Sequence, residues 1–237
     1  MATFEQQVEA LTSIAIDSSS TPTQDELSQF LKDGVMDVTS KHLAIRPQDA
    51  HMFTRVTAET TSNDSLSVNG SKIVSVVREA GTDNDWRECR EIPIGLQSNV
   101  TDADSLHYAS KYNPAYMVAD TNKISVFPAP GSDPDTFKVY YVNKDAVNGS
   151  GNPLVYSHDD ILYFPISKVY LVVTYAAIKS LEAKLAFYTI EEEDEELVRA
   201  LQVSLQQLQV SYGAGFLPDK NYEAALQSQG QQRRQRA

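Results

Sequence analysis

The chain has 237 residues, of which 41% are hydrophobic and 22% are charged, proportions that favour a globular protein over a disordered one. Its formal net charge of −12 at pH 7 disfavours tight nucleic-acid binding, which needs Lys and Arg to neutralise phosphates. No apolar run approaches the roughly 20 residues of a membrane span, and residues 1–16 lack the basic start of a signal peptide. The single cysteine, Cys89, excludes an internal disulfide framework. We therefore expect a protein made and kept in a cytosol-like compartment, outside any membrane.

Residues 1–48 carry two helical patterns. Apolar residues recur at helical spacing from Phe4 onward, which predicts a short amphipathic helix. A break rich in turn-forming residues follows at residues 17–22. Thr23–Glu26 has the spacing of a capping box, and the apolar face after it predicts a second helix that ends near His42. The residues of that face are Leu27, Phe30, Leu31, Val35, Val38 and His42.

Residues 49–157 have a different character. Short stretches rich in Val and Thr alternate with Asn, Asp, Gly and Pro, a pattern typical of short strands. The strand candidates are Met52–Thr57, Leu66–Val68, Ile73–Arg78, Arg87–Ile92, Tyr116–Val118, Ile124–Phe127 and Phe137–Val142. Asn69-Gly70 between two of them indicates a hairpin, because both residues tolerate positive φ. We also expect one short helix at Asp102–Ser110, capped by Thr101 or by its own first residue.

Residues 158–215 predict two long helices. Pro165 suits the first position of a helix, where its missing amide costs nothing, and Thr189–Glu192 is a second possible capping box. The apolar face of the last helix consists of Leu197, Leu201, Leu205, Leu208 and Tyr212. The short link at Phe187–Ile190 makes the two helices antiparallel. Residues 216–237 become Gln-rich and end with several arginines, so they form an extended tail without a core of its own.

Together these patterns predict an α+β fold. The N-terminal helices of residues 1–48 and the C-terminal helices of residues 158–215 form an antiparallel helical bundle, and residues 49–157 form an inserted antiparallel β-rich domain. Residues 216–237 are the tail. No repeat at a solenoid period is visible.

The residue types that carry chemistry do not form a persuasive constellation. The four histidines are scattered, and none has metal-ligand spacing to Cys89. The run His158-Asp159-Asp160 offers three ligands, but acids at the start of a helix explain it better. Cys89 lies in a period-two pattern, so we interpret it as a strand residue and not as a nucleophile. The acidic run Glu191–Glu196 lacks the alternation and glycine of a calcium loop. The sequence therefore predicts no catalytic, cofactor-binding or metal-binding residue.

Two further functions stay open at this point. Carboxylates are abundant, so a glycosidase-like pair could form in space, but sequence cannot locate one. The aromatic content also permits a sugar-binding module without singling it out.

Three segments resemble a known class of virion proteins. Asp159–Lys184, in which Phe164-Pro165 opens a long Ala-rich helix, is similar to proteins of short-tailed and marine phages. So are the upstream runs Tyr112–Val118 and Ile124–Pro130 with Tyr140–Val142. The layout as a whole resembles the head-to-tail adaptors of tailed phages, which are also called connector, neck or head-completion proteins.

The resemblance implies a structural protein of the virion neck, made in the cytoplasm of the host bacterium. Such adaptors self-associate into a ring, here expected to be a dodecamer, bind the portal protein and tail proteins of the nozzle, tube or fibres, and continue the DNA channel. Genomic DNA passes through without sequence-specific binding, which suits an acidic surface. The family carries no catalytic residue, cofactor or metal.

In such adaptors the C-terminal tail often grips the portal. The residues expected to do so here are Gln227, Gln229, Gln231, Gln232, Arg233, Arg234 and Arg236. The β region is longer than in the smaller adaptors, so a different tail, baseplate or fibre-docking component is the first alternative. A virion-associated polysaccharide hydrolase that works with two carboxylates is the second.

Overall fold

A computed structural model describes residues 2–68, 71–81, 84–120, 122–191 and 195–217. The fold is mixed α+β, as the sequence predicts. The chain divides into two compact units. Unit 1 contains residues 1–47 and 145–237, and unit 2 contains residues 48–144. None of the described helices is long and apolar enough to cross a membrane.

Unit 1 begins with two capped helices, α1 (Phe4–Thr12) and α2 (Gln24–Ile45). Thr3 and Gln6 form a capping box at the start of α1, and the predicted capping box of Thr23 and Glu26 starts α2. Each box satisfies backbone amides that would otherwise lack partners. Of the six residues predicted for the apolar face of α2, Leu27, Leu31, Val35, Val38 and His42 are buried, whereas Phe30 is only partly buried.

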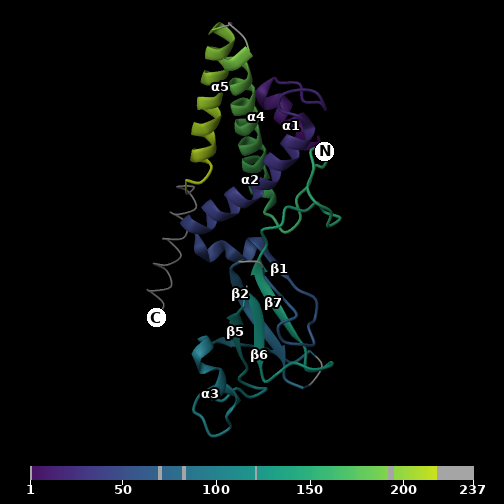
Figure 1. Cartoon of the computed structure of the whole chain (residues 1–237), viewed down its shortest axis with the longest axis vertical. Helices are drawn as coiled ribbons and strands as arrows, with labels where there is room; N and C mark the ends of the chain where they lie inside the picture. Colours follow the sequence, from purple (N-terminus) through teal and green to yellow (C-terminus); the bar gives the residue numbers. More distant parts are fainter. Residues whose placement is uncertain (1, 69–70, 82–83, 121, 192–194, 218–237) are drawn as a thin grey trace, which may run out of the picture. The chain divides into compact units, whose positions relative to one another are not determined.

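The central helix of unit 1 is α4 (Val169–Glu191), which follows a 3₁₀ turn, η3 (Ile166–Lys168). It contacts α1, α2 and α5 (Glu195–Ala214), and Figure 1 shows α5 running back alongside it. Because the first half of α4 is buried on several sides, at Leu171–Thr174 and Ala176–Ile178, it suits a position between several partners. Its fully buried apolar residues are Leu171, Val172, Ala176, Ala177 and Leu181.

Gly34 has a packing role that propensity alone does not indicate. A Cβ atom at this position of α2 would lie 3.1 Å from the Tyr175 ring and 3.2 Å from a methyl group of Val172. Glycine weakens a helix in isolation, but here it lets α2 approach α4 closely.

Residues 145–164 form an irregular segment that belongs to unit 1 in the structure, whereas the sequence pattern grouped residues 145–157 with the β region. The amides of Phe4 and Glu5 donate to the carbonyls of His158 and Tyr156, at 2.8 and 3.0 Å. The N–H of Tyr156 donates in turn to Oγ of Ser28, at 3.0 Å. These contacts hold the segment against the starts of both N-terminal helices.

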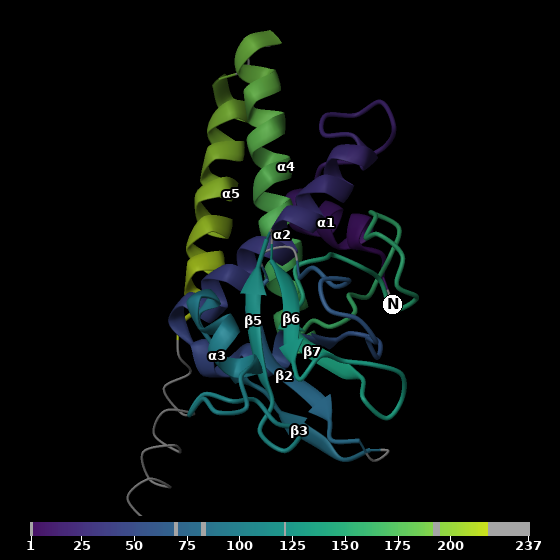
Figure 2. The same ribbon diagram turned by 60° about the horizontal axis from the view of Figure 1, so that its bottom comes forward.

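Unit 2 contains two sheets. A 3₁₀ helix, η1 (Pro47–Phe53), leads into the four-stranded sheet, whose order is β1-β7-β2-β3 and whose pairs are all antiparallel. The three-stranded sheet has the order β4-β5-β6, and Figure 2 shows β5 beside β6. The strands are β1 (Thr54–Val56), β2 (Ile73–Glu79), β3 (Trp86–Glu88), β4 (Arg90–Glu91), β5 (Ala115–Ala119), β6 (Lys123–Phe127) and β7 (Phe137–Val142).

Residues of both sheets share one core. Its buried members are Val68, Val76, Cys89, Tyr116, Ile124, Val126, Phe137 and Val139. The other side of β5 and β6 packs on a second cluster, which includes Val100 of the short helix α3 (Gln97–Thr101) and Ile92, just before the 3₁₀ turn η2 (Ile94–Leu96). Alternate residues of β5 therefore point into two different cores.

Four predictions for the β region need correction. The predicted strand Arg87–Ile92 is two short strands, β3 and β4, in different sheets, and Cys89 lies between them and belongs to neither. The region is not antiparallel throughout, because β4 pairs with β5 in parallel. Leu66–Val68 is no strand and makes only an isolated bridge, from Ser67 to Lys123. Asp102–Ser110 is not helical: the helix comes earlier, as α3. The predicted hairpin turn at Asn69-Gly70 lies outside the described residues.

Local hydrogen bonds explain why Asp102–Ser110 does not continue the helix. Oδ1 of Asp102 accepts from the N–H of Asp104, and Oγ of Ser105 accepts from the N–H of His107. Such side-chain bonds offer the backbone an alternative to helical pairing, so the residues that looked like helix caps instead form consecutive turns.

Candidate functional site

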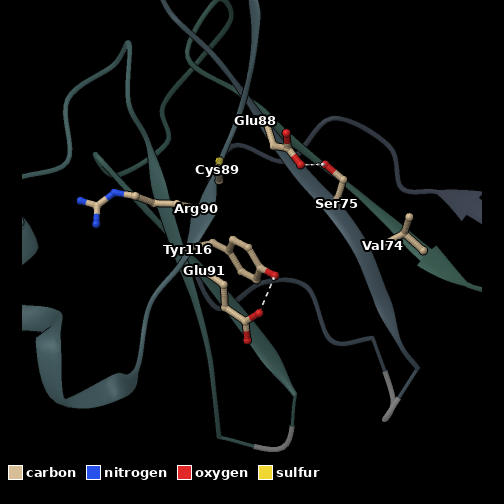
Figure 3. A pocket seen from close by; sticks show the side chains of 7 residues that line it. All are labelled: Val74, Ser75, Glu88, Cys89, Arg90, Glu91 and Tyr116. Carbon is tan, nitrogen blue, oxygen red and sulfur yellow. Dashed lines mark hydrogen bonds between the residues drawn. The ribbon is translucent and has the colours of Figure 1, made fainter. Parts of the chain in front are cut away.

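Two features stand out as candidates, a hollow in unit 2 and the outer surface of α5 in unit 1. The hollow has a volume of about 360 Å³ and is lined by Val74, Ser75, Glu88, Cys89, Arg90, Glu91 and Tyr116. It opens where the chain leaves β3 in one sheet and enters β4 in the other (Figure 3). Because of this crossover, β3 before Cys89 and β4 after it lie in different sheets.

A bulge shapes one wall of the hollow. The pairing of β2 with β7 shifts between Ile73 and Ser75, so Val74 is the extra residue. Bulges re-aim side chains, and Val74 remains exposed at 41% although it belongs to a central strand. Val74 thus adds an apolar group to a wall that also carries Ser75.

Two glutamates line the hollow, and a hydroxyl group orients each of them (Figure 3). Ser75 Oγ donates to Oε1 of Glu88 at 3.4 Å. Tyr116 Oη donates to Oε2 of Glu91 at 3.3 Å. No Lys or Arg of the described residues forms an ion pair with either glutamate. Both are exposed.

The one cation that lines the hollow, Arg90, is turned away from these carboxylates (Figure 3). Its Nη2 donates to the carbonyl of His107 and, at 3.4 Å, to the carbonyl of Tyr108. Its buried Nε makes no hydrogen bond within the described residues. Arg90 therefore fastens the turns after α3 to β4 and leaves the hollow acidic.

Cys89 forms part of the floor and is not a nucleophile. Burial raises the pKa of its thiol to about 12, and only 4% of the residue is exposed. A reactive cysteine needs the opposite shift, toward the thiolate. Burial and the neighbouring Glu91 also raise the pKa of Tyr116 to about 12. Both groups are neutral near pH 7 and contribute packing and one hydrogen bond.

The histidines and acids considered in the sequence lie in separate places. His42 is buried in α2, His51 and His107 are exposed, and no group of three or more potential ligands forms a metal site in the described part of the chain. The acidic run before α5 lies largely outside the described residues, although Glu195 pairs with Arg199 at 3.2 Å.

The run at His158–Asp160 is structural, but not for the predicted reason. It precedes α4 by several residues and so does not form the start of a helix. Asp160 instead accepts from the N–H of Gly149 at 3.1 Å, and the Nε2 atom of His158 lies 3.1 Å from Nδ2 of Asn148. These bonds cross-link the irregular segment of unit 1.

Sequence reasoning missed a buried ionic network at the end of β2. Arg78, 3% exposed, donates to the carbonyls of Pro128, Ala129 and Glu79, and pairs with Asp135 at 3.1 Å. The carboxylate of Glu79 in turn accepts from the hydroxyl of Thr136 at 2.7 Å. Apart from the neighbouring Glu79, the partners of Arg78 lie 50 or more residues away in sequence, so no local pattern could have indicated the network.

The second candidate is α5, which is poorly covered. Among its described side chains only Tyr212 is buried. The predicted leucine face, at Leu197, Leu201, Leu205 and Leu208, is partly buried. Val203 and Val210 are 56% and 70% exposed. At 3.6 residues per turn these two valines lie on the side opposite the leucine face, so α5 has apolar residues both toward and away from α4.

The predicted portal-contact residues, Gln227, Gln229, Gln231, Gln232, Arg233, Arg234 and Arg236, lie outside the described residues. No protein-family model matches the chain, and no curated protein matches it in sequence.

Proposed function

We propose that this protein is a structural component of a phage particle, a head-to-tail adaptor that forms a ring between the portal and the tail and continues the DNA channel. The observation that carries the proposal is the outer face of α5. Val203 and Val210 are seven residues apart and exposed on a long helix, which is the spacing at which one helix packs lengthwise on another.

In this proposal unit 1 supplies the helical bundle of the adaptor. Its α4–α5 pair packs against the same pair of neighbouring copies, so that weak contacts are repeated by symmetry around the ring. The β-rich unit 2 then docks tail proteins. The residues after Asn221, with their glutamines and arginines, contact the portal, where a guanidinium group can bind acidic side chains in a bidentate manner.

The acidic composition agrees with this role. With 32 acidic and 20 basic residues, the protein repels the phosphate backbone of DNA in general. A ring that DNA traverses must not retain it.

The test is assembly on the portal of the same particle. Purified chain and portal are mixed, and native mass spectrometry counts the copies bound. We expect a complex with one copy per portal subunit, and loss of that complex when the residues after Asn221 are deleted. Replacing Val203 and Val210 with Glu reduces the number of copies bound. The matched control replaces Gln202 and Gln209 with Glu as well. Both residues are exposed on a lateral side of α5, so we expect the complex to stay intact.

Two other outcomes would replace the proposal. A chain that does not bind the portal but binds tail proteins would be a tail, baseplate or fibre-docking component.

The second outcome concerns the hollow in unit 2. It holds two glutamates, Glu88 and Glu91, which is the composition that a glycosidase requires. Both are exposed, whereas the acid of such a pair needs burial to keep its proton. Release of sugars from phage-receptor polysaccharide by the purified chain, lost in Glu88→Gln and Glu91→Gln, would establish the hydrolase instead.

A further inference from the structure

We propose that two copies of this protein pair face to face through the four-stranded sheet of unit 2. The contacting surface, here called the outer sheet face, is the side of this sheet that points away from the core of unit 2. It binds the same face of a second copy. Only residues of unit 2 take part, so the pairing does not depend on the adaptor role.

The register of the strands defines which side chains share the outer sheet face. Val76 and Val139 are paired and buried in the core, so their neighbours in sequence point to the opposite side. Lys138, Val77 and Glu88 lie directly opposite one another on β7, β2 and β3. They therefore form one row across the outer sheet face, with a cation at one end, a valine in the middle and a carboxylate at the other end.

The outer sheet face carries more apolar surface than a solvated face requires. A sheet with one face in water usually has polar residues on that face. Here the next row contains Val56, Tyr140 and Ser75, of which Val56 is 44% and Tyr140 is 36% exposed. Trp86 of β3 is partly buried, and its ring centroid lies 4.0 Å from Nζ of Lys138. Apolar side chains gathered on an open face in this way mark an interaction surface.

The row of Lys138, Val77 and Glu88 is complementary to itself. When two copies face each other across a two-fold axis that runs along β2, the two ends of the row exchange places. Lys138 of each copy then lies opposite the partner's Glu88, and the two valines meet at the axis, as in an isologous contact. An axis across the strands would instead place lysine opposite lysine, so the charges select the axis along β2. Packed sheets align their strands to within about 30°, which this axis allows.

Both charged groups of the row can take a further partner. Glu88 accepts one hydrogen bond, from the hydroxyl of Ser75 at 3.4 Å, and forms no ion pair with the described Lys and Arg residues. Nζ of Lys138 lies 2.8 Å from Oε1 of Glu59. An ammonium group has three donors, so Lys138 can bind a second carboxylate without losing the first.

The hollow lies beside this row and offers a place for an aromatic ring. Ser75 pairs with Tyr140 on one side, and on its other side the chain leaves the sheet at Cys89, where the hollow opens (Figure 3). The same two-fold axis places Tyr140 of the partner copy opposite this opening. A volume of about 360 Å³ accommodates the ring, and the incoming hydroxyl can donate to the carboxylate of Glu91.

The experiment measures dimerisation of the full chain, without portal, by sedimentation velocity over a range of concentrations. Lys138→Glu and Glu88→Lys each place two pairs of like charges opposite one another in the dimer. We expect each variant alone to dimerise at least about tenfold more weakly than the wild type, since opposed like charges are unfavourable at an interface.

An equal mixture of the two variants provides the decisive comparison. In a mixed dimer the new Glu at position 138 faces the new Lys at position 88, and the unchanged Glu88 of one copy faces the unchanged Lys138 of the other. Both ion pairs are restored, so dimerisation should return to about the wild-type level. A substitution that only destabilised unit 2 would not be rescued in this way.

Two controls are matched to these variants. Lys123→Glu also reverses a lysine that pairs with an acid, Asp120 at 3.2 Å, but Lys123 lies on β6 in the other sheet, and we expect the dimer to persist. Tyr140→Ala should weaken the dimer, whereas Tyr112→Ala, at a tyrosine 63% exposed elsewhere in unit 2, should not.

A wild-type chain that is monomeric at every concentration measured would overturn the proposal. So would a mixture of the two charge-reversed variants that dimerises no better than either one alone. Replacing Val203 and Val210 with Glu should leave this dimer unchanged while it reduces binding to the portal, so the pairing of unit 2 and the adaptor role fail separately.

Discussion

Removal of one hydroxyl group, in Tyr212→Phe, should loosen α5 from the rest of unit 1. Tyr212 is 8% exposed and donates its hydroxyl to Oδ2 of Asp37 on α2. The Lys41 ammonium lies 4.9 Å from its ring centroid, and the Phe216 ring packs edge-on at 5.1 Å. Burial and the Asp37 hydrogen bond raise the pKa of Tyr212, so the donor keeps its proton throughout the neutral range.

The magnitude follows from the kind of bond that is lost. A hydrogen bond to a charged group contributes about 1.5 to 3 kcal/mol, and Asp37 is partly solvated, with 28% of its side chain exposed. We therefore expect Tyr212→Phe to lower the free energy of unfolding by about 1.5 kcal/mol. With a slope near 2 kcal/mol per molar urea, the midpoint falls by about 0.7 M. Tyr212→Ala also removes the ring contacts and should cost about 3 kcal/mol.

The assay is urea unfolding followed by far-UV circular dichroism, together with hydrogen exchange of the amides of α5. The matched control is Tyr170→Phe, because Tyr170 is 51% exposed on α4 and should change stability by less than about 0.5 kcal/mol. Faster exchange in Tyr212→Phe should be confined to α5 and the facing part of α2. If the two Phe variants unfold alike, Tyr212 does not anchor α5 and the reasoning is wrong.

Three further predictions concern other parts of the chain. Gly149→Ala should destabilise unit 1 by about 1 kcal/mol in urea unfolding, because its Cβ would lie 2.1 Å from Oδ2 of Asp160 and would push this exposed carboxylate off the N–H that it accepts from. Gly213→Ala, with open space around it, should not. Cys89→Ala should flatten the alkaline loss of stability between about pH 9 and 12. The thiol's pKa is raised from 9.0 to about 12 on folding, so above pH 9 the unfolded state binds fewer protons and stability falls. Arg78→Met should destabilise unit 2 by about 3 kcal/mol, since buried carbonyls lose their donors, while the exposed Arg87→Met should have little effect.

The long helix α2 and the strand β7 were predictable because their signals are local. The Thr23 capping box and the apolar face of α2 occur as expected, and β7 runs from Phe137 to Val142 as the alternating pattern indicates. Caps and periodic faces involve residues a few positions apart. The sequence therefore contains nearly all the information that these elements require.

The rest depended on contacts between distant residues. The parallel pairing of β4 with β5 arises because the chain changes sheets at Cys89. That crossover also creates the hollow, whose lining residues extend from Val74 to Tyr116. The turns at Asp102–Ser110 are an exception, because they reflect a local competition between helix and side-chain hydrogen bonds that join residues two positions apart. No periodicity within the sequence encodes these outcomes.

The adaptor role is tested most directly by native mass spectrometry of the full chain mixed with the portal of the same particle. The account predicts a discrete complex with one copy per portal subunit, and fewer bound copies when Val203 and Val210 are both replaced by Glu. A chain that remains monomeric beside the portal, under conditions in which the portal itself is intact, would contradict it.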